Sequence, residues 1–245
     1  MSGDREYREL PVFYDALMRS VPYSYWTEYI RSLFDRYGIR PGSILDVACG
    51  TGTMTREFAD LGMEAVGLDI SQGMIDCARD KYPGLEFHCA DAAEFDLGRR
   101  FDCAVSLFDS LNYITDKERL RMAFRCVEKH LEPGGCFIFD MNTIYALSMG
   151  FFRQADLEGW PHYIWEPKWD PRTRICRVDM TFEVRDETGK VSVVKECHVQ
   201  KGYRQKEIVC MLEDAGLSFE EAFDAYTLNR TNKRSDRIFY VARKY

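Results

Sequence analysis

The stretch Ser43-Ile44-Leu45-Asp46-Val47-Ala48-Cys49-Gly50-Thr51-Gly52-Thr53 decides the fold of this chain. It predicts a buried strand that ends in a carboxylate, followed by a glycine turn against which a nucleotide can lie, because glycine has no Cβ to obstruct the ligand. The dinucleotide-binding turn G-x-G-x-x-G needs a third small residue, and Thr55 stands at that position. The carboxylate of Asp46 would repel a pyrophosphate, so the turn favours a ligand end that carries positive charge.

Strands and helices alternate on both sides of this stretch. A helix is expected at 24–37, ended by Gly38, and another at 53–61. Ser71 begins a third helix, and the apolar spacing over 120–131 indicates a fourth that ends at Pro133-Gly134-Gly135. Strands are expected at 43–47, 64–69, 85–89, 101–107 and 136–139. This alternation predicts a parallel, doubly wound α/β sheet with ligands at the carboxyl ends of its strands.

The pattern changes after Asn142. Extended runs at 160–169, 175–185 and 191–198 predict an antiparallel β insertion over 159–199. A helix near 208–215 and two strands at 217–226 and 237–243 follow, and we expect the two strands to form a hairpin at the sheet edge. The expected fold is a mostly parallel seven-stranded sheet with an antiparallel insertion after its fifth strand, in a single domain over 1–245.

Composition narrows the function classes. The chain has 245 residues, 46% of them apolar, which suffices for one large core. Its net charge of −7 disfavours a large nucleic-acid footprint. Two basic clusters are interpreted as solvated surface, with a small RNA contact left open: Lys195, Lys201, Arg204 and Lys206, and Arg230, Lys233, Arg234 and Arg237.

Cysteine spacing and the amino terminus carry further expectations. The nine cysteines are spread without a C-x-x-C pair, which indicates reduced, mostly buried thiols and no metal site. Residues 1–6 lack a basic segment followed by an apolar one, and no apolar run approaches the roughly 20 residues of a spanning helix. We therefore expect a cytoplasmic protein that does not enter a membrane.

The pattern D-x-x-x-G-x-G, made by Asp46, Gly50 and Gly52, resembles motif I of the class I S-adenosylmethionine-dependent methyltransferases, which have a Rossmann-like fold. The resemblance implies that S-adenosyl-L-methionine is the cofactor and S-adenosyl-L-homocysteine the product. It also implies that Asp69 binds both ribose hydroxyls and that Asp91 accepts a hydrogen bond from the adenine amino group. The remaining contacts implied near this cofactor are Ala48, Ile70, Met74 and Ala92.

Within that family, the likeness is to small bacterial enzymes with an aromatic N-terminal lid, including sugar-amine N-methyltransferases. It rests on 13–18, 21–26 and Phe108-Asp109-Ser110-Leu111-Asn112-Tyr113. The resemblance implies a helical lid over 1–40, in which Tyr14, Tyr23 and Trp26, together with Phe108, surround the sulfonium cation and exclude water. The alternative for Trp26, that it is ordinary core, stays open.

The expected reaction is in-line methyl transfer to a small-molecule acceptor, an amine or a hydroxyl. Asn112, Tyr113 and His162 are the candidate catalytic residues, with His162 placed by the insertion that we expect to cover the acceptor. Further candidates are Asp109, Asn142, His198 and Tyr203, whereas His88 and His130 are interpreted as structural.

Other functions stay open from the sequence alone. The Asn/Asp-Pro-Pro-aromatic tetrapeptide used for planar nitrogens is missing after the fourth strand, where Phe108 and Asp109 stand instead. An RNA or protein methyltransferase and a non-catalytic scaffold that binds S-adenosylmethionine are the alternatives. The sequence does not decide between a monomer and a homodimer.

Overall fold

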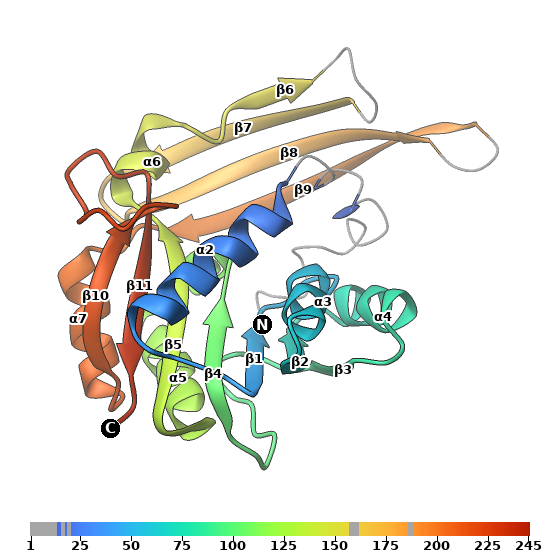
Figure 1. The fold of residues 1–245 in the computed structure, drawn as a ribbon. Coiled ribbons are helices and arrows are strands. Elements are labelled where there is room, and N and C mark those ends of the chain that lie inside the picture. Colours follow the sequence, from blue (N-terminus) through green and yellow to red (C-terminus); the bar gives the residue numbers. More distant parts are fainter. Residues whose placement is uncertain (1–13, 16–17, 19–20, 157–161, 186–188) are drawn as a thin grey trace.

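The structure is a computed structural model that describes residues 14–15, 18, 21–156, 162–185 and 189–245. Phe13, Ala16 and Leu17 of the predicted lid, and Trp160 of the predicted insertion, lie outside the described residues. The described residues include two sheets, a large one at the centre and a smaller one above its carboxyl edge (Figure 1).

The central sheet has seven strands in the order β10-β11-β5-β4-β1-β2-β3. Five strands run parallel and form the region that we expected to be doubly wound: β1 (Ser43–Val47), β2 (Glu64–Asp69), β3 (Glu86–Cys89), β4 (Phe101–Ser106) and β5 (Leu131–Asn142). The C-terminal hairpin, β10 (Ser218–Asp224) and β11 (Arg237–Arg243), adds two antiparallel strands beside β5. The predicted fold class is therefore confirmed.

Helices cover both faces of the central sheet because consecutive strand residues point to opposite sides. Ile44 packs with α2 (Tyr23–Arg36) and α3 (Thr53–Asp60), whereas Leu45 packs with α5 (Lys117–Lys129) and α7 (Gln205–Asp214). A further helix, α4 (Gln72–Lys81), packs on β3. Buried strands between two helical layers leave the carboxyl edge as the place where a ligand can enter.

The structure corrects the role expected for the Pro133-Gly134-Gly135 segment, which was predicted to separate a helix from the fifth strand. It lies inside β5, because α5 already ends at Lys129 and the strand begins at Leu131. The register against β4 shifts from Phe101↔Leu131 to Cys103↔Cys136, so this segment forms a bulge. A Cβ on Gly135 would lie 2.8 Å from the Glu132 carbonyl oxygen, which explains the requirement for glycine there.

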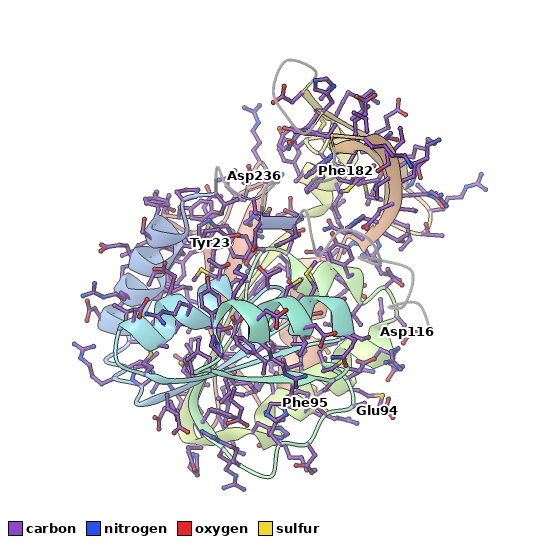
Figure 2. All side chains as sticks on the ribbon, turned by 90° about the vertical axis from the view of Figure 1, so that its right-hand side faces the viewer. Tyr23, Glu94, Phe95, Asp116, Phe182 and Asp236 are labelled. Atoms are coloured by element: carbon purple, nitrogen blue, oxygen red, sulfur yellow. The ribbon has the colours of Figure 1, made fainter. Side chains whose placement is uncertain are left out.

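The second sheet is antiparallel in the order β6-β7-β8-β9 and follows the short helix α6 (Ile144–Met149). Its strands are β6 (Gln154–Asp156), β7 (His162–Asp170), β8 (Ile175–Arg185) and β9 (Val191–Lys201). The expected range of 159–199 was therefore too short at both ends. Figure 2 shows Phe182 within this sheet, above the body of the molecule that carries Asp116.

No helix among the described residues is long and apolar enough to cross a membrane.

Candidate functional site

Two joined cavities lie at the carboxyl ends of β1, β2, β3 and β4. The first is lined by Tyr14, Tyr23, Asp46, Ala48, Cys49, Gly50, Thr51, Thr53, Met54, Leu107, Phe108 and Ser110. The second shares Ala48 and Ser110 with the first and is also lined by Leu68, Asp69, Ile70, Ala90, Asp91, Ala92, Leu111, Tyr113, Ile114, Thr115, Asp116 and Arg119. The sequence motifs at three strand ends therefore meet in one cleft.

The glycine turn after β1 has a left-handed backbone at Ala48, Gly50 and Gly52, with φ of 63°, 56° and 78°. A Cβ on Gly52 would lie 2.6 Å from the ring of Phe87, so tight packing inside the protein already requires this glycine. At Gly50 the nearest atom to an added Cβ belongs to Tyr14, 4.0 Å away, across the first cavity. Of the two, Gly50 is the one that keeps the backbone open toward a ligand.

Asp46 is buried at the base of the first cavity, and one carboxylate oxygen accepts a hydrogen bond of 2.7 Å from the Thr55 hydroxyl. Burial raises the pKa of Asp46 to about 7, and the nearby charge of Asp69 acts in the same direction. Thr55, the residue that breaks the dinucleotide-binding pattern, thus holds the carboxylate in place. The pair leaves a partly uncompensated acid that a cationic ligand group would stabilise.

Asp69 ends β2 and lines the second cavity. Its two oxygens accept backbone N–H groups of Gly50 at 2.9 Å and Ser71 at 2.8 Å. Burial raises the pKa of this carboxyl, although both hydrogen bonds lower it. Each oxygen keeps a second lone pair, so the group can still accept from a pair of hydroxyls.

Asp91 and Ala92 follow β3 and line the same cavity, where Asp91 accepts the Ala93 N–H at 2.8 Å. Its other oxygen binds the guanidinium of Arg119, which also lines the cavity. Sequence reasoning missed Arg119, since no local pattern links the first turns of α5 to the loop after β3. The planar guanidinium gives this end of the cleft a surface on which an aromatic base can stack.

Aromatic rings enclose the Asp46 end of the cleft. Tyr14, Tyr23 and Phe108 line the first cavity, and the Tyr23 and Phe108 rings meet edge to face with centroids 5.6 Å apart. Burial raises the pKa of Tyr14 well above its ordinary value, and the neighbouring Tyr23 and Tyr113 add to the effect. Tyr14 is therefore a neutral phenol. Tyr23, labelled in Figure 2, is the first residue of α2, so the amino-terminal end of this helix borders the first cavity.

Trp26 does not line either cavity, so the lid role predicted for it needs correction. It is buried in the core between α2 and the sheet, where it stacks on Phe108 with ring centroids 4.0 Å apart. The helical spacing that aligns Trp26 with Ile30 and Leu33 turns all three toward the same core. Trp26 supports Phe108 from behind.

The two residues predicted beside the adenine ring, Ile70 and Met74, lie in different environments. Ile70 lines the second cavity and is 48% exposed, so its side chain is available to contact a flat ligand. Met74 is only 2% exposed and lines neither cavity, because the first turn of α4 directs it inward. The prediction for Met74 is therefore corrected.

Asn112 is a structural clamp rather than a candidate catalytic group. It is fully buried, and its amide nitrogen donates to the carbonyls of Asn142 at 3.1 Å and Lys201 at 2.9 Å. Its oxygen accepts the Asn142 N–H at 2.9 Å. Both donors are consumed in joining the loop after β4 to the ends of β5 and β9, so none is left for a substrate.

The other two candidate catalytic residues differ in position. Tyr113 lines the second cavity, and its hydroxyl lies 2.9 Å from Nδ1 of His198 on β9. His162 lines neither cavity and instead lies on β7, with Nδ1 3.0 Å from a Glu183 oxygen on β8. The inserted sheet thus holds His162 within its own strand pairing and away from both cavities, and the prediction for His162 is corrected.

A buried ionic cluster behind Phe108 was also missed. Arg237, expected in a solvated basic cluster, binds the carboxylates of Asp109, at 2.7 Å, and Asp140. Burial raises the pKa of Asp140 to about 6 despite the arginine. The cluster fixes the loop after β4, where Phe108 and Asp109 have φ of 60° and 53°. Such strained backbone persists only where its surroundings hold it, and here it aims Phe108 into the cleft.

In the part of the chain that the structure describes, no three His, Cys, Asp or Glu side chains stand together in a way that could hold a metal ion.

Comparisons with known proteins agree with this geometry. Residues 44–135 match the methyltransferase domain family. A putative methyltransferase of Geobacillus sp. (strain WCH70) is 30% identical over 97% of this chain and 99% of its own length. The dTDP-3-amino-3,4,6-trideoxy-alpha-D-glucopyranose N,N-dimethyltransferase of Streptomyces venezuelae is 30% identical over 73% of this chain and 76% of its own length. A crystal structure of an S-adenosylmethionine-dependent methyltransferase from Clostridium acetobutylicum superposes with a TM-score of 0.85 at 28% identity, covering 97% of this chain and 98% of that one.

Proposed function

Because this chain belongs to the S-adenosylmethionine-dependent methyltransferases, we propose that it methylates the amino group of a small molecule, specifically an amino sugar carried on a nucleotide. The family membership gives the cofactor and the reaction class. The acceptor class is supported by the Streptomyces venezuelae relative, whose name describes dimethylation of a dTDP-linked 3-amino sugar.

The observation that carries the proposal is the convergence of Asp46, Asp69 and Asp91 on one continuous cleft. A carboxylate at the Asp46 end suits the ammonium of the methionine moiety, and Asp69 suits a ribose diol. Asp91 and Arg119 then lie at the adenine end. This order along the cleft matches the order of the three groups along an extended S-adenosylmethionine molecule.

The aromatic wall suits the reacting end of the cofactor. A sulfonium is a cation, so the ring faces of Tyr14, Tyr23 and Phe108 offer it electrostatic attraction. Methyl transfer needs the acceptor nitrogen in line with the carbon–sulfur bond. The bond to nitrogen forms as the carbon–sulfur pair leaves with a neutral sulfur, and alignment alone contributes about 7–11 kcal/mol.

The position of the second sheet favours an acceptor site between this sheet and the cleft. Tyr14 lines the first cavity and also packs against the apolar cluster of this sheet. The buried members of that cluster are Leu147, Cys176, Val178, Met180, Phe182 and Val194. An acceptor above Tyr14 is therefore expected to meet a partly aromatic, apolar cover, which excludes the water that would compete for the methyl group.

Calorimetry with S-adenosylhomocysteine tests the cofactor part. Asp69→Ala removes two charge-assisted contacts to the ribose, each worth about 1.5–3 kcal/mol, so the affinity should fall at least about 100-fold. Asp76→Ala, an exposed carboxylate on α4, is the matched control and should bind as the native protein does. Unchanged binding by Asp69→Ala, with native thermal stability, would contradict the assignment.

Product formation tests the acceptor. The native protein should convert dTDP-3-amino-3,4,6-trideoxy-alpha-D-glucopyranose, or another nucleotide-linked amino sugar in a panel, to mono- and dimethylamino products. S-adenosylhomocysteine binding without turnover of any amine would refute the acceptor class. Turnover of RNA or protein in the same assay would establish the polymer alternative.

A further inference from the structure

Tyr113 is linked to the second sheet through His198, which in turn contacts Glu196. It ends the short helical turn η2 (Ser110–Tyr113), lines the second cavity, and places its hydroxyl 2.9 Å from Nδ1 of His198. The two rings meet edge to face with centroids 5.6 Å apart. His198 Nε2 in turn lies 3.0 Å from a carboxylate oxygen of Glu196. These three groups form a continuous chain from the cleft into the second sheet.

The two residues of β9 in this hydrogen-bonded series are buried. The side chains of His198 and Glu196 are each 3% exposed. They lie two apart on β9 and therefore project from the same face of the sheet, where β8 pairs them with the apolar residues Val178 and Met180. A carboxylate is costly to bury without a partner, so its placement against the imidazole needs a reason beyond packing.

The network fixes the histidine tautomer. A carboxylate only accepts hydrogen bonds, so Nε2 of His198 carries the proton that is donated to Glu196. In the neutral imidazole Nδ1 is then the acceptor, and the Tyr113 hydroxyl donates a hydrogen bond to it. This is the arrangement by which a carboxylate orients an imidazole as a base in hydrolytic triads, here with a tyrosine in place of the serine.

Tyr113 lines the second cavity, which joins the first, reacting cavity at the shared residues Ala48 and Ser110. The phenol of Tyr14, which lines the cavity beside Asp46, is close enough for Tyr113 and Tyr23 to influence its titration. Tyr14 itself has a strongly raised pKa and is unsuited to accept a proton. Tyr113, backed by an imidazole, is the better route for a proton that leaves this space.

The geometry points to Tyr113, His198 and Glu196 as a proton relay for the acceptor amine, in which Tyr113 contacts the substrate and the two residues of β9 are positioning residues. The inference rests on the proposed function. An acceptor that enters as R–NH3⁺ gives one proton to the Tyr113 oxygen while the proton of Tyr113 moves to His198 Nδ1. His198 becomes an imidazolium paired with Glu196, and the freed nitrogen lone pair attacks the methyl carbon.

Steady-state kinetics of Glu196→Gln tests the relay with the amino sugar that the native enzyme turns over. The amide keeps an acceptor for Nε2–H but cannot stabilise an imidazolium, so kcat should fall about 100-fold. The KM for S-adenosylmethionine and the affinity for S-adenosylhomocysteine should not change. Glu183→Gln is the matched control, because Glu183 makes a similar contact to His162 in the same sheet, away from both cavities.

Two further measurements separate a relay from a merely structural contact. Tyr113→Phe, Glu196→Gln and the double variant should show nearly the same loss in kcat, because residues that act as one unit are not additive. Nitrogen-15 NMR of the histidines should show His198 protonated at Nε2. Losses that multiply in the double variant, or a His198 protonated at Nδ1, would overturn the relay.

Failure of the relay and failure of the proposed function give different results. If the native protein methylates an amino sugar and Glu196→Gln matches Glu183→Gln in kcat, the relay is wrong and the proposed function stands. If the native protein binds S-adenosylhomocysteine but methylates no amine, the proposed acceptor class is wrong and the relay falls with it.

Discussion

At the scale of single residues, Asp46 links protonation to ligand binding. Its pKa is raised to about 7 by burial, against an ordinary value near 4. The folded state therefore binds a proton more tightly than the unfolded state, and this group's contribution to stability falls as the pH rises from about 4 to about 7. A ligand ammonium beside the carboxylate would reverse the shift and release the proton.

We therefore expect S-adenosylhomocysteine to bind more tightly as the pH rises toward 7. Calorimetry at pH 6 in buffers of different ionisation enthalpy should record net proton release on binding. Asp46→Asn should release fewer protons than the native protein, because the asparagine amide does not titrate. Equal binding enthalpies in all buffers, or equal release by Asp46→Asn, would show that the ligand does not pair with this carboxylate.

Residues at strand ends were predictable, and residues defined by tertiary partners were not. Asp46, Asp69 and Asp91 could be placed together because the strands of a parallel sheet end at one edge. Trp26, Met74 and His162 are of types that serve core and site equally well, and only packing separates these roles. Arg119 and Arg237 could not be assigned from sequence, since their carboxylate partners lie far away along the chain.

At the scale of elements, hydrophobic periodicity predicted most helices and strands, whereas the boundaries between them were predicted less well. The Pro133-Gly134-Gly135 segment has the composition of a turn, and the structure uses it as a bulge within β5. The beginning of the second sheet was also missed, because β6 is only three residues long and has no distinctive alternation. Short elements depend on pairing with neighbours, which a local pattern does not contain.

The Asn112 clamp gives a prediction at this scale. Asn112→Ala would leave three buried backbone groups at the ends of β5 and β9 without their side-chain partner. At about 1 kcal/mol or more for each hydrogen bond, the free energy of unfolding in urea should fall by about 2–4 kcal/mol. Ser148→Ala removes an exposed hydrogen bond from the Ser148 hydroxyl to the Tyr145 carbonyl within α6, and should cost far less.

The same variant distinguishes a clamp from a catalytic group. Folded Asn112→Ala protein, assayed well below its unfolding temperature, should retain kcat within about tenfold of the native value if the residue only joins elements. Native stability together with a kcat loss of 100-fold or more would return Asn112 to the reacting centre.

At the scale of the whole molecule, the site depends on two sheets. The central sheet supplies the carboxylates at its edge, and the second sheet stands above that edge (Figure 1). Asn112 ties the two together, and the Tyr113–His198–Glu196 chain crosses between them. The family fold thus provides cofactor binding, and we propose that acceptor choice depends on the inserted sheet.

A crystal structure of the protein with S-adenosylhomocysteine tests the central claim most directly. The account predicts the ligand extended through both cavities, with its ammonium within hydrogen-bonding distance of Asp46, its ribose hydroxyls on Asp69 and its adenine between Ile70 and Arg119 near Asp91. A ligand bound anywhere else, such as the hollow between Tyr145 and Arg204, with Asp46 and Asp69 untouched, would contradict it.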